Sequence, residues 1–103
     1  MQLHTRPLLY ADIAEEVEYL AIHAGAETAL RWKAALDRTI QQLLRHPGLG
    51  RSRLDLKPAG NRSWRVEHFW RWLVFYTVEG QTLILLRVRY GMMDLPALAF
   101  DLP

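Results

Sequence analysis

The hydrophobic pattern changes its period once along this chain, and that change constrains the fold more than any other feature. From Pro7 to Arg45 apolar residues recur every three or four positions, which is typical of amphipathic helices. From Ser63 to Tyr90 the pattern has a period of two, which is typical of β-strands. Helices that precede strands predict an α+β domain in which the helices cover one face of a sheet.

Two helices are expected in the first half of the chain. Pro7 suits the first turn of a helix, where its missing N–H costs nothing, and Gly25 is a natural stop. A second helix is expected from about Ala26 to Arg45, because His46-Pro47-Gly48 closes it. The short link between the helices predicts an antiparallel hairpin. The second helix has one apolar stripe, made of Ala29, Trp32, Leu36, Ile40 and Leu43.

Strands are expected before and after the helices. Gln2–Thr5 can form a short opening strand, and a polar loop follows the second helix. Three strands then follow, at Ser63–Glu67, Trp70–Val78 and Thr82–Tyr90, with a hairpin turn around Gly80. Their short links predict an antiparallel meander, so the expected order is β-α-α-β-β-β, with the helical hairpin packed on one face of a small antiparallel sheet.

Strand parity divides the sheet residues between two faces. On one face, Arg65, Arg87 and Arg89 are expected together, exposed and away from the helices. Trp72 shares parity with Val74 and Tyr76, which favours core packing and a protein-binding patch over base stacking for this aromatic run. The residues expected beneath the helices are Trp64, Val66, Ile84, Leu86 and Val88.

Length and composition indicate one folded domain over residues 1–103. Half of the residues are hydrophobic, which excludes a disordered chain, and the absence of Cys excludes a disulfide scaffold. We expect a cytoplasmic location, because the first residues do not resemble a signal peptide and no apolar run approaches about 20 residues. The four His are scattered and no Gly-rich phosphate loop opens a helix, so neither a metal nor a cofactor is expected.

Basic residues are concentrated in the second half. Residues 51–103 contain eight Lys or Arg against five acidic residues, whereas residues 1–50 contain five against six. The alternatives are a solvated charged surface and a surface for an anionic partner, protein or nucleic acid.

A catalytic role and a binding role are both open for these residues. Cleavage of RNA through its 2′-OH needs a base, an acid and cations. Arg65, Arg87 and Arg89 would supply the cations, and the base would be Glu67 or His68. Arg itself is a poor base. In the binding alternative, a target or partner protein contacts Arg65, Trp70, Trp72, Arg87 and Arg89.

The order of elements and three segments resemble the ParE/RelE toxins of bacterial type II toxin–antitoxin modules. HPGLGR (46–51) is similar to the loop after the family's second helix, and SWRVEHFWRWLVFYTVEG (63–80) is similar to its hairpin, with Arg65 and Tyr76 at recurrent positions. ILLRVRYGMMDL (84–95) is similar to the last-strand segment, with matches at Arg87, Val88, Gly91 and Asp94. Two positions depart from the pattern, because Tyr90 replaces a His and Met93 replaces an Arg.

The resemblance implies a ParE-like plasmid-stabilisation toxin that inhibits DNA gyrase by binding, without catalysis. A cognate antitoxin would neutralise it in a hetero-oligomer. The alternative is a RelE-like endonuclease that cuts mRNA on the ribosome, in which Tyr90 is a further candidate for proton transfer. The departures at Tyr90 and Met93 favour the binding toxin. A third alternative is a relative that has lost its toxicity.

Overall fold

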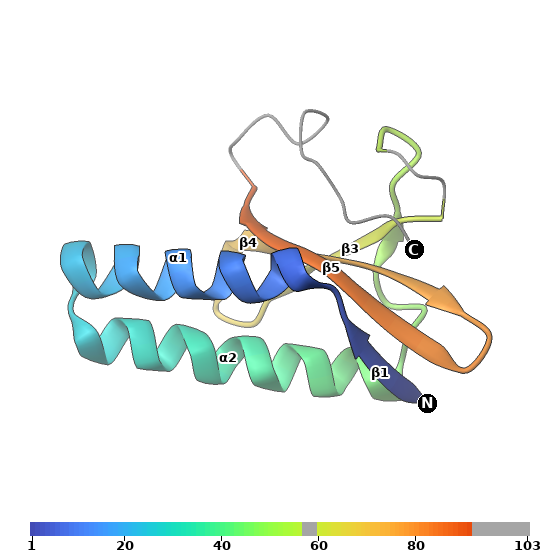
Figure 1. Ribbon diagram of the computed structural model, residues 1–103, viewed down its shortest axis with the longest axis horizontal. Coiled ribbons are helices and arrows are strands. Elements are labelled where there is room, and N and C mark those ends of the chain that lie inside the picture. The colour runs from blue at the N-terminus through green and yellow to red at the C-terminus, as the bar shows by residue number, and fades with distance from the viewer. Residues whose placement is uncertain (57–59, 92–103) are drawn as a thin grey trace.

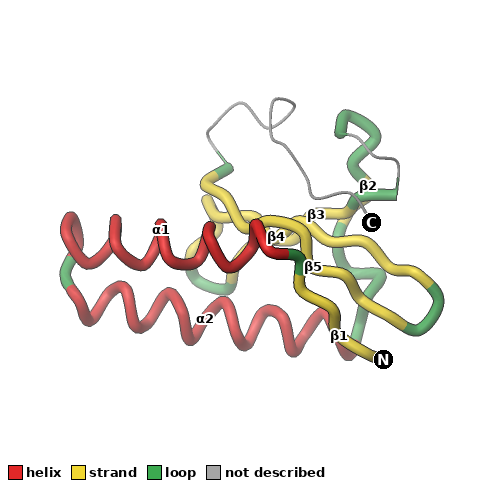
Figure 2. The backbone as a smooth tube through the Cα atoms, viewed as in Figure 1, coloured by secondary structure: helices red, strands yellow, loops and turns green. Residues whose placement is uncertain are grey.

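The computed structural model describes residues 1–56 and 60–91, in which two helices lie against one five-stranded sheet (Figure 1). Figure 2 shows the helical hairpin as one layer and the strands as the other, with the hairpin extending beyond the sheet at the α1–α2 link. The elements, in chain order, are β1 (Gln2–Thr5), α1 (Pro7–Ala24), α2 (Ala26–Arg45), β2 (Arg51–Ser52), β3 (Arg62–Val66), β4 (Phe69–Glu79) and β5 (Thr82–Tyr90).

Both predicted helices are confirmed, and their ends have local causes. Pro7 occupies the first turn of α1, and Gly25 ends it with φ at 95°, a backbone conformation that side chains with a Cβ rarely adopt. At the end of α2, the His46 N–H donates to the Gln42 carbonyl, and Pro47 cannot continue the helix.

The sheet has the strand order β1-β5-β4-β3-β2. Strands β3, β4 and β5 form the predicted antiparallel meander. Two features are additional. β1 pairs in parallel with β5, from Gln2 opposite Thr82 to Thr5 opposite Leu85, so the sheet is mixed. The short strand β2 pairs with β3 inside the segment expected to be a loop.

A bulge at Leu86 corrects the predicted assignment of faces. Phe75 pairs with Arg87 and Tyr76 with Leu85, so Leu86 has no partner on β4. One extra residue reverses the alternation of side chains. The prediction that Ile84 and Leu86 lie under the helices is therefore wrong.

The core beneath the helices contains Leu83 and Leu85 of β5 in their place. The expected positions of Val66 and Val88 there are confirmed, and Trp64 packs partly buried against the same cluster. Ile84 and Leu86 pack on the opposite face in a second cluster, with Phe75 and Leu56. The predicted stripe of α2 is buried against the sheet.

The buried stripe of α1 consists of Leu9, Asp12, Glu16 and Leu20, so two of its four members are acidic. Buried carboxylates need hydrogen-bond partners, and these partners come from β4 and β5. In the described part of the chain, no helix is both long and apolar enough to span a bilayer.

Candidate functional site

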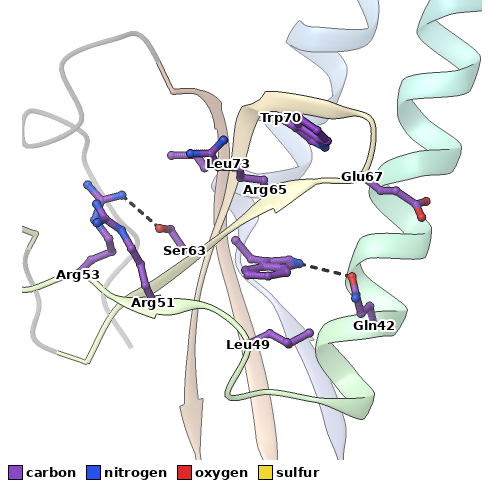
Figure 3. A pocket seen from close by; sticks show the side chains of 10 residues that line it. Gln42, Leu49, Arg51, Arg53, Ser63, Arg65, Glu67, Trp70 and Leu73 are labelled. Atoms are coloured by element: carbon purple, nitrogen blue, oxygen red, sulfur yellow. Dashed lines mark hydrogen bonds between the residues drawn. The ribbon is translucent and has the colours of Figure 1, made fainter.

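A groove of about 740 Å³ opens where the end of α2 meets β2, β3 and β4 (Figure 3). We call it the tryptophan groove. It is lined by Gln42, Leu49, Arg51, Arg53, Ser63, Trp64, Arg65, Glu67, Trp70 and Leu73.

Two indole rings give the groove its apolar surface. Trp64 is half-buried, and its Nε1 donates to Gln42 Oε1 at 3.4 Å. Trp70 is 67% exposed, which is unusual for so large an apolar side chain. An exposed Trp beside a half-buried one is typical of a surface that binds a partner.

The loop that leads into the groove is held by a buried tyrosine. Tyr76 donates its hydroxyl hydrogen to the Pro47 carbonyl at 2.7 Å and accepts the Gly50 N–H at 2.8 Å. Arg62 Nη1 donates to the Gly50 carbonyl at 2.6 Å. Burial raises the pKa of the Tyr76 phenol. These contacts place Leu49 and Arg51 at the groove.

One guanidinium in the groove is part of the fold. Arg53 is 5% exposed, and it donates to both carboxylate oxygens of Asp55 at 2.8 and 2.6 Å and to Ser63 Oγ at 3.2 Å. Its guanidinium also lies 5.7 Å from the centre of the Phe75 ring. The hydrogen bond from Arg53 lowers the pKa of the Asp55 carboxyl to about 2.

Arg51 and Arg65 are the cations in the groove that are available to a partner. Both are exposed, and among the described residues neither has a carboxylate within ion-pair distance. The predicted binding residues Arg65 and Trp70 therefore lie together in the groove, whereas Arg51 was not predicted. The sequence feature that could have indicated Arg51 is its position directly after the HPGLG segment (46–50).

Glu67 and His68, the two candidate bases, form the turn between β3 and β4. Glu67 lines the groove, but Arg38 Nε donates to its carboxylate at 2.7 Å, and this bond lowers the pKa of Glu67. His68 has φ at 63° and lines a different hollow, beside Arg31 and Phe69. A carboxylate with a lowered pKa is a weak base, so the two groups do not form an acid–base pair in the groove.

Arg87 and Arg89 lie outside the groove, and their side chains are only 11% and 14% exposed, which corrects the expectation that they are open to solvent. Their predicted sheet face is confirmed, because Arg65 and Arg89 both pair with Leu73. Arg87 donates to Asp12 through Nε at 2.7 Å and Nη2 at 2.9 Å. Arg89 Nη1 donates to Asp12 at 3.2 Å and to Glu15 at 3.1 Å. Burial opposes the charge of Arg89, but the bonds to Glu15 and Asp12 outweigh it and raise its pKa.

The reason for this arrangement is the edge of β5. β1 ends at Thr5, so no described strand pairs with the part of β5 after Leu85 on that side. Asp12 of α1 occupies this edge and accepts the Val88 N–H at 3.1 Å. The alternation of side chains along a strand does not predict this contact, because the acid belongs to a helix 75 residues earlier in the chain.

Trp72 and Tyr90 also support the fold. Trp72 Nε1 donates to Glu16 of α1 at 3.0 Å, and the ring packs edge-on against Trp32 and Tyr90, which confirms its place in the core. Tyr90 accepts a hydrogen bond from Arg71 at 3.3 Å. Met93 and Asp94 lie outside the described residues. Within residues 1–56 and 60–91, no three potential metal ligands converge.

Residues 5–95 match the family described as the ParE toxin of the type II toxin–antitoxin system parDE. The chain belongs to this ParE toxin family. It is 30% identical over 95 residues to Toxin ParE3 of Caulobacter vibrioides, covering 92% of this chain and 90% of that protein.

A solved structure has the same fold. It is described as the chromosomal ParDE TA system from P. aeruginosa, and it superposes with a TM-score of 0.73 at 21% identity, covering 87% of this chain and 95% of the other. The fold prediction is therefore confirmed, and the chain is a ParE-type toxin of a toxin–antitoxin system.

Proposed function

We propose that this toxin inhibits DNA gyrase by binding to it in the cytoplasm, and that a cognate antitoxin neutralises it in a hetero-oligomer. The observation that carries the proposal is that Arg51 and Arg65, which form no ion pair with a described carboxylate, share one groove with the exposed ring of Trp70. Arg and Trp are the residues that most often dominate binding energy at protein interfaces. An acidic, apolar segment of a partner would complement this groove.

The distribution of charged groups supports binding over RNA cleavage. Arg87 and Arg89 are engaged by Asp12 and Glu15, and Glu67 by Arg38. A phosphoryl group in the tryptophan groove would meet cations, but no acid–base pair. Of the candidate catalytic residues, Arg65 and Glu67 line the groove, whereas His68, Arg87, Arg89 and Tyr90 do not.

Gyrase supercoiling in a purified system tests the target. The unmodified toxin should inhibit it, and Arg65→Glu and Trp70→Ala should each weaken inhibition by about 30-fold or more, the effect of losing an interface hot spot. Arg71→Glu is the matched control, because Arg71 is exposed on β4 outside the groove and should behave as the unmodified toxin.

Two further measurements separate the alternatives. Adding the product of the adjacent reading frame should restore supercoiling and co-purify with the toxin. Cleavage of ribosome-bound mRNA by the unmodified toxin, with gyrase unaffected, would contradict the proposal and identify the chain as an endonuclease.

A further inference from the structure

Charge is segregated between the two helices. α1 contains Asp12, Glu15, Glu16 and Glu18 and no Lys or Arg, whereas α2 contains four basic residues and two acidic ones. Three of the acids of α1 bind groups on β4 and β5. The arginines near α1 are thus compensated, and the uncompensated positive charge gathers on the side formed by α2, β2 and β3.

Three arginines of α2 lie along one side of the helix. Arg31, Arg38 and Arg45 are spaced seven residues apart, and all three are exposed. Side chains at this spacing drift only about 20° per step around a helix, so the three share one stripe about 21 Å long. We call it the arginine stripe.

Among the described residues, only the middle arginine of the stripe forms an ion pair with an acid. Arg31 Nη2 donates to Thr28 Oγ1 at 3.2 Å, and Arg38 donates to Glu67 in a bridge whose side chains are 57% and 46% exposed. Arg45 follows Gln41 and Gln42, which are neutral. Two other acids of α2 lie beside the stripe: Asp37 is bound by Lys33 at 2.8 Å, and Glu27 lies one turn before Arg31.

Hollows lie between successive arginines. One, of about 350 Å³, is lined by Arg31, Arg38 and His68 among others. The next, of about 440 Å³, is lined by Arg38 and Arg45 and also by Asp37 and Glu67, whose carboxylates are bound by Lys33 and Arg38. The second hollow shares Gln42 and Glu67 with the tryptophan groove. A polyanion that follows the stripe would therefore pass beside the groove.

We propose that the arginine stripe binds the phosphate backbone of duplex DNA, so that the toxin contacts the DNA held by gyrase as well as the enzyme. This inference rests on the proposed function, which brings the toxin to a DNA-bound target. Successive arginines are about 10 Å apart along the helix. This distance is close to the width of the DNA major groove, about 12 Å, which separates the phosphates on its two sides. The guanidinium fork suits phosphate oxygens.

The stripe suits DNA better than a protein. Among the described residues, α2 has no exposed large apolar side chain between Arg31 and Arg45. A stable protein interface needs such an anchor at its centre. Binding to phosphates needs only charge and donors.

The test uses the purified toxin without gyrase and a fluorescent duplex of about 30 base pairs, with anisotropy measured over a salt series. Three phosphate contacts predict that the logarithm of the binding constant falls with the logarithm of salt with a slope of about −2.7. Arg45→Gln should reduce that slope by about 0.9, and Arg31→Gln with Arg45→Gln by about 1.8. Arg71→Gln, which removes the same charge from β4, should leave both affinity and slope unchanged.

Each outcome decides the question. Equal losses for Arg45→Gln and Arg71→Gln would show that net charge, not the stripe, binds the duplex. Absence of duplex binding, or stripe-dependent binding of a polyglutamate peptide alone, would overturn the proposal in favour of an acidic protein partner. A toxin that inhibits supercoiling without binding the duplex refutes only the stripe, whereas one that binds the duplex but leaves gyrase active refutes the proposed target.

Discussion

Asp12 and Arg87 lie 75 residues apart in the chain and form a two-bond ion pair, with Nε 2.7 Å from Oδ2 and Nη2 2.9 Å from Oδ1. The same carboxylate accepts the Val88 N–H. One side chain of α1 therefore balances the charge of Arg87 and also accepts a backbone hydrogen bond from the edge of β5. The first helix is thus attached to the last strand by polar contacts as well as by apolar packing.

Loss of this carboxylate should be costly. Asp12 is 3% exposed and Arg87 11%, so Asp12→Ala leaves a nearly buried guanidinium without its main partner. Removing one member of a buried pair costs about 3–5 kcal/mol, which urea unfolding would measure. Asp37→Ala is the control, because its exposed pair with Lys33 should contribute less than about 1 kcal/mol. Equal effects would show that the buried pair is unimportant.

The packing of α2 gives a second prediction. Leu36 is fully buried in the core between α2 and the sheet. Leu36→Ala should lower the free energy of unfolding by about 2–5 kcal/mol. Leu30, which is 70% exposed on the same helix, provides the comparison, and Leu30→Ala should change stability by less than about 0.5 kcal/mol. A loss below about 1 kcal/mol for Leu36→Ala would contradict the assigned core.

The close approach of Gly50 to Tyr76 gives a third prediction. A Cβ at position 50 would lie 2.5 Å from the Tyr76 hydroxyl oxygen, so Gly50→Ala must displace the loop or the ring. Overpacking of this kind costs about 1–3 kcal/mol in denaturant unfolding. Gly48→Ala, two residues away, meets no atom within 4 Å and should be tolerated. If both variants melt alike, the loop is not held by Tyr76.

The fourth prediction concerns the stability of the protein at low pH. The pKa of Asp55 is about 2 in the folded protein against an ordinary 3.8, because Arg53 donates to it. A lowered folded pKa means that the stabilisation is present above pH 3.8 and is lost as the pH falls towards about 2. Carboxyl NMR titration should show the Asp55 pKa rising towards its ordinary value in Arg53→Met. An unchanged pKa would show that Arg53 is not its cause.

Local signals were sufficient for both helices and for four of the five strands, but not for β2. Pro7, Gly25 and Pro47 mark the helix ends through backbone geometry, and the change of hydrophobic period marks the start of the meander. Such signals depend only on neighbours in the chain, so they can be read from a single sequence.

The contacts that the sequence did not reveal are long-range. The parallel pairing of β1 with β5 joins the two ends of the described chain, and the bulge at Leu86 depends on how β4 and β5 meet. The bulge reversed the faces of Ile84 and Leu86, and the acid that binds Arg87 and Arg89 comes from a distant helix. Three of the five predicted binding residues, Trp72, Arg87 and Arg89, therefore make contacts within the fold, whereas Arg65 and Trp70 lie in the groove.

The pairing of β1 with β5 also determines when this protein can complete its fold during synthesis. Of the described strands, β1 is synthesised first and pairs only with β5, which is synthesised last, and Asp12 cannot form its ion pair before Arg87 has been synthesised. Contacts of such large sequence separation form late. A nascent chain that stops before β5 has an unpaired β1 and lacks the strand on which α1 packs, so the described fold is complete only after β5 has been translated.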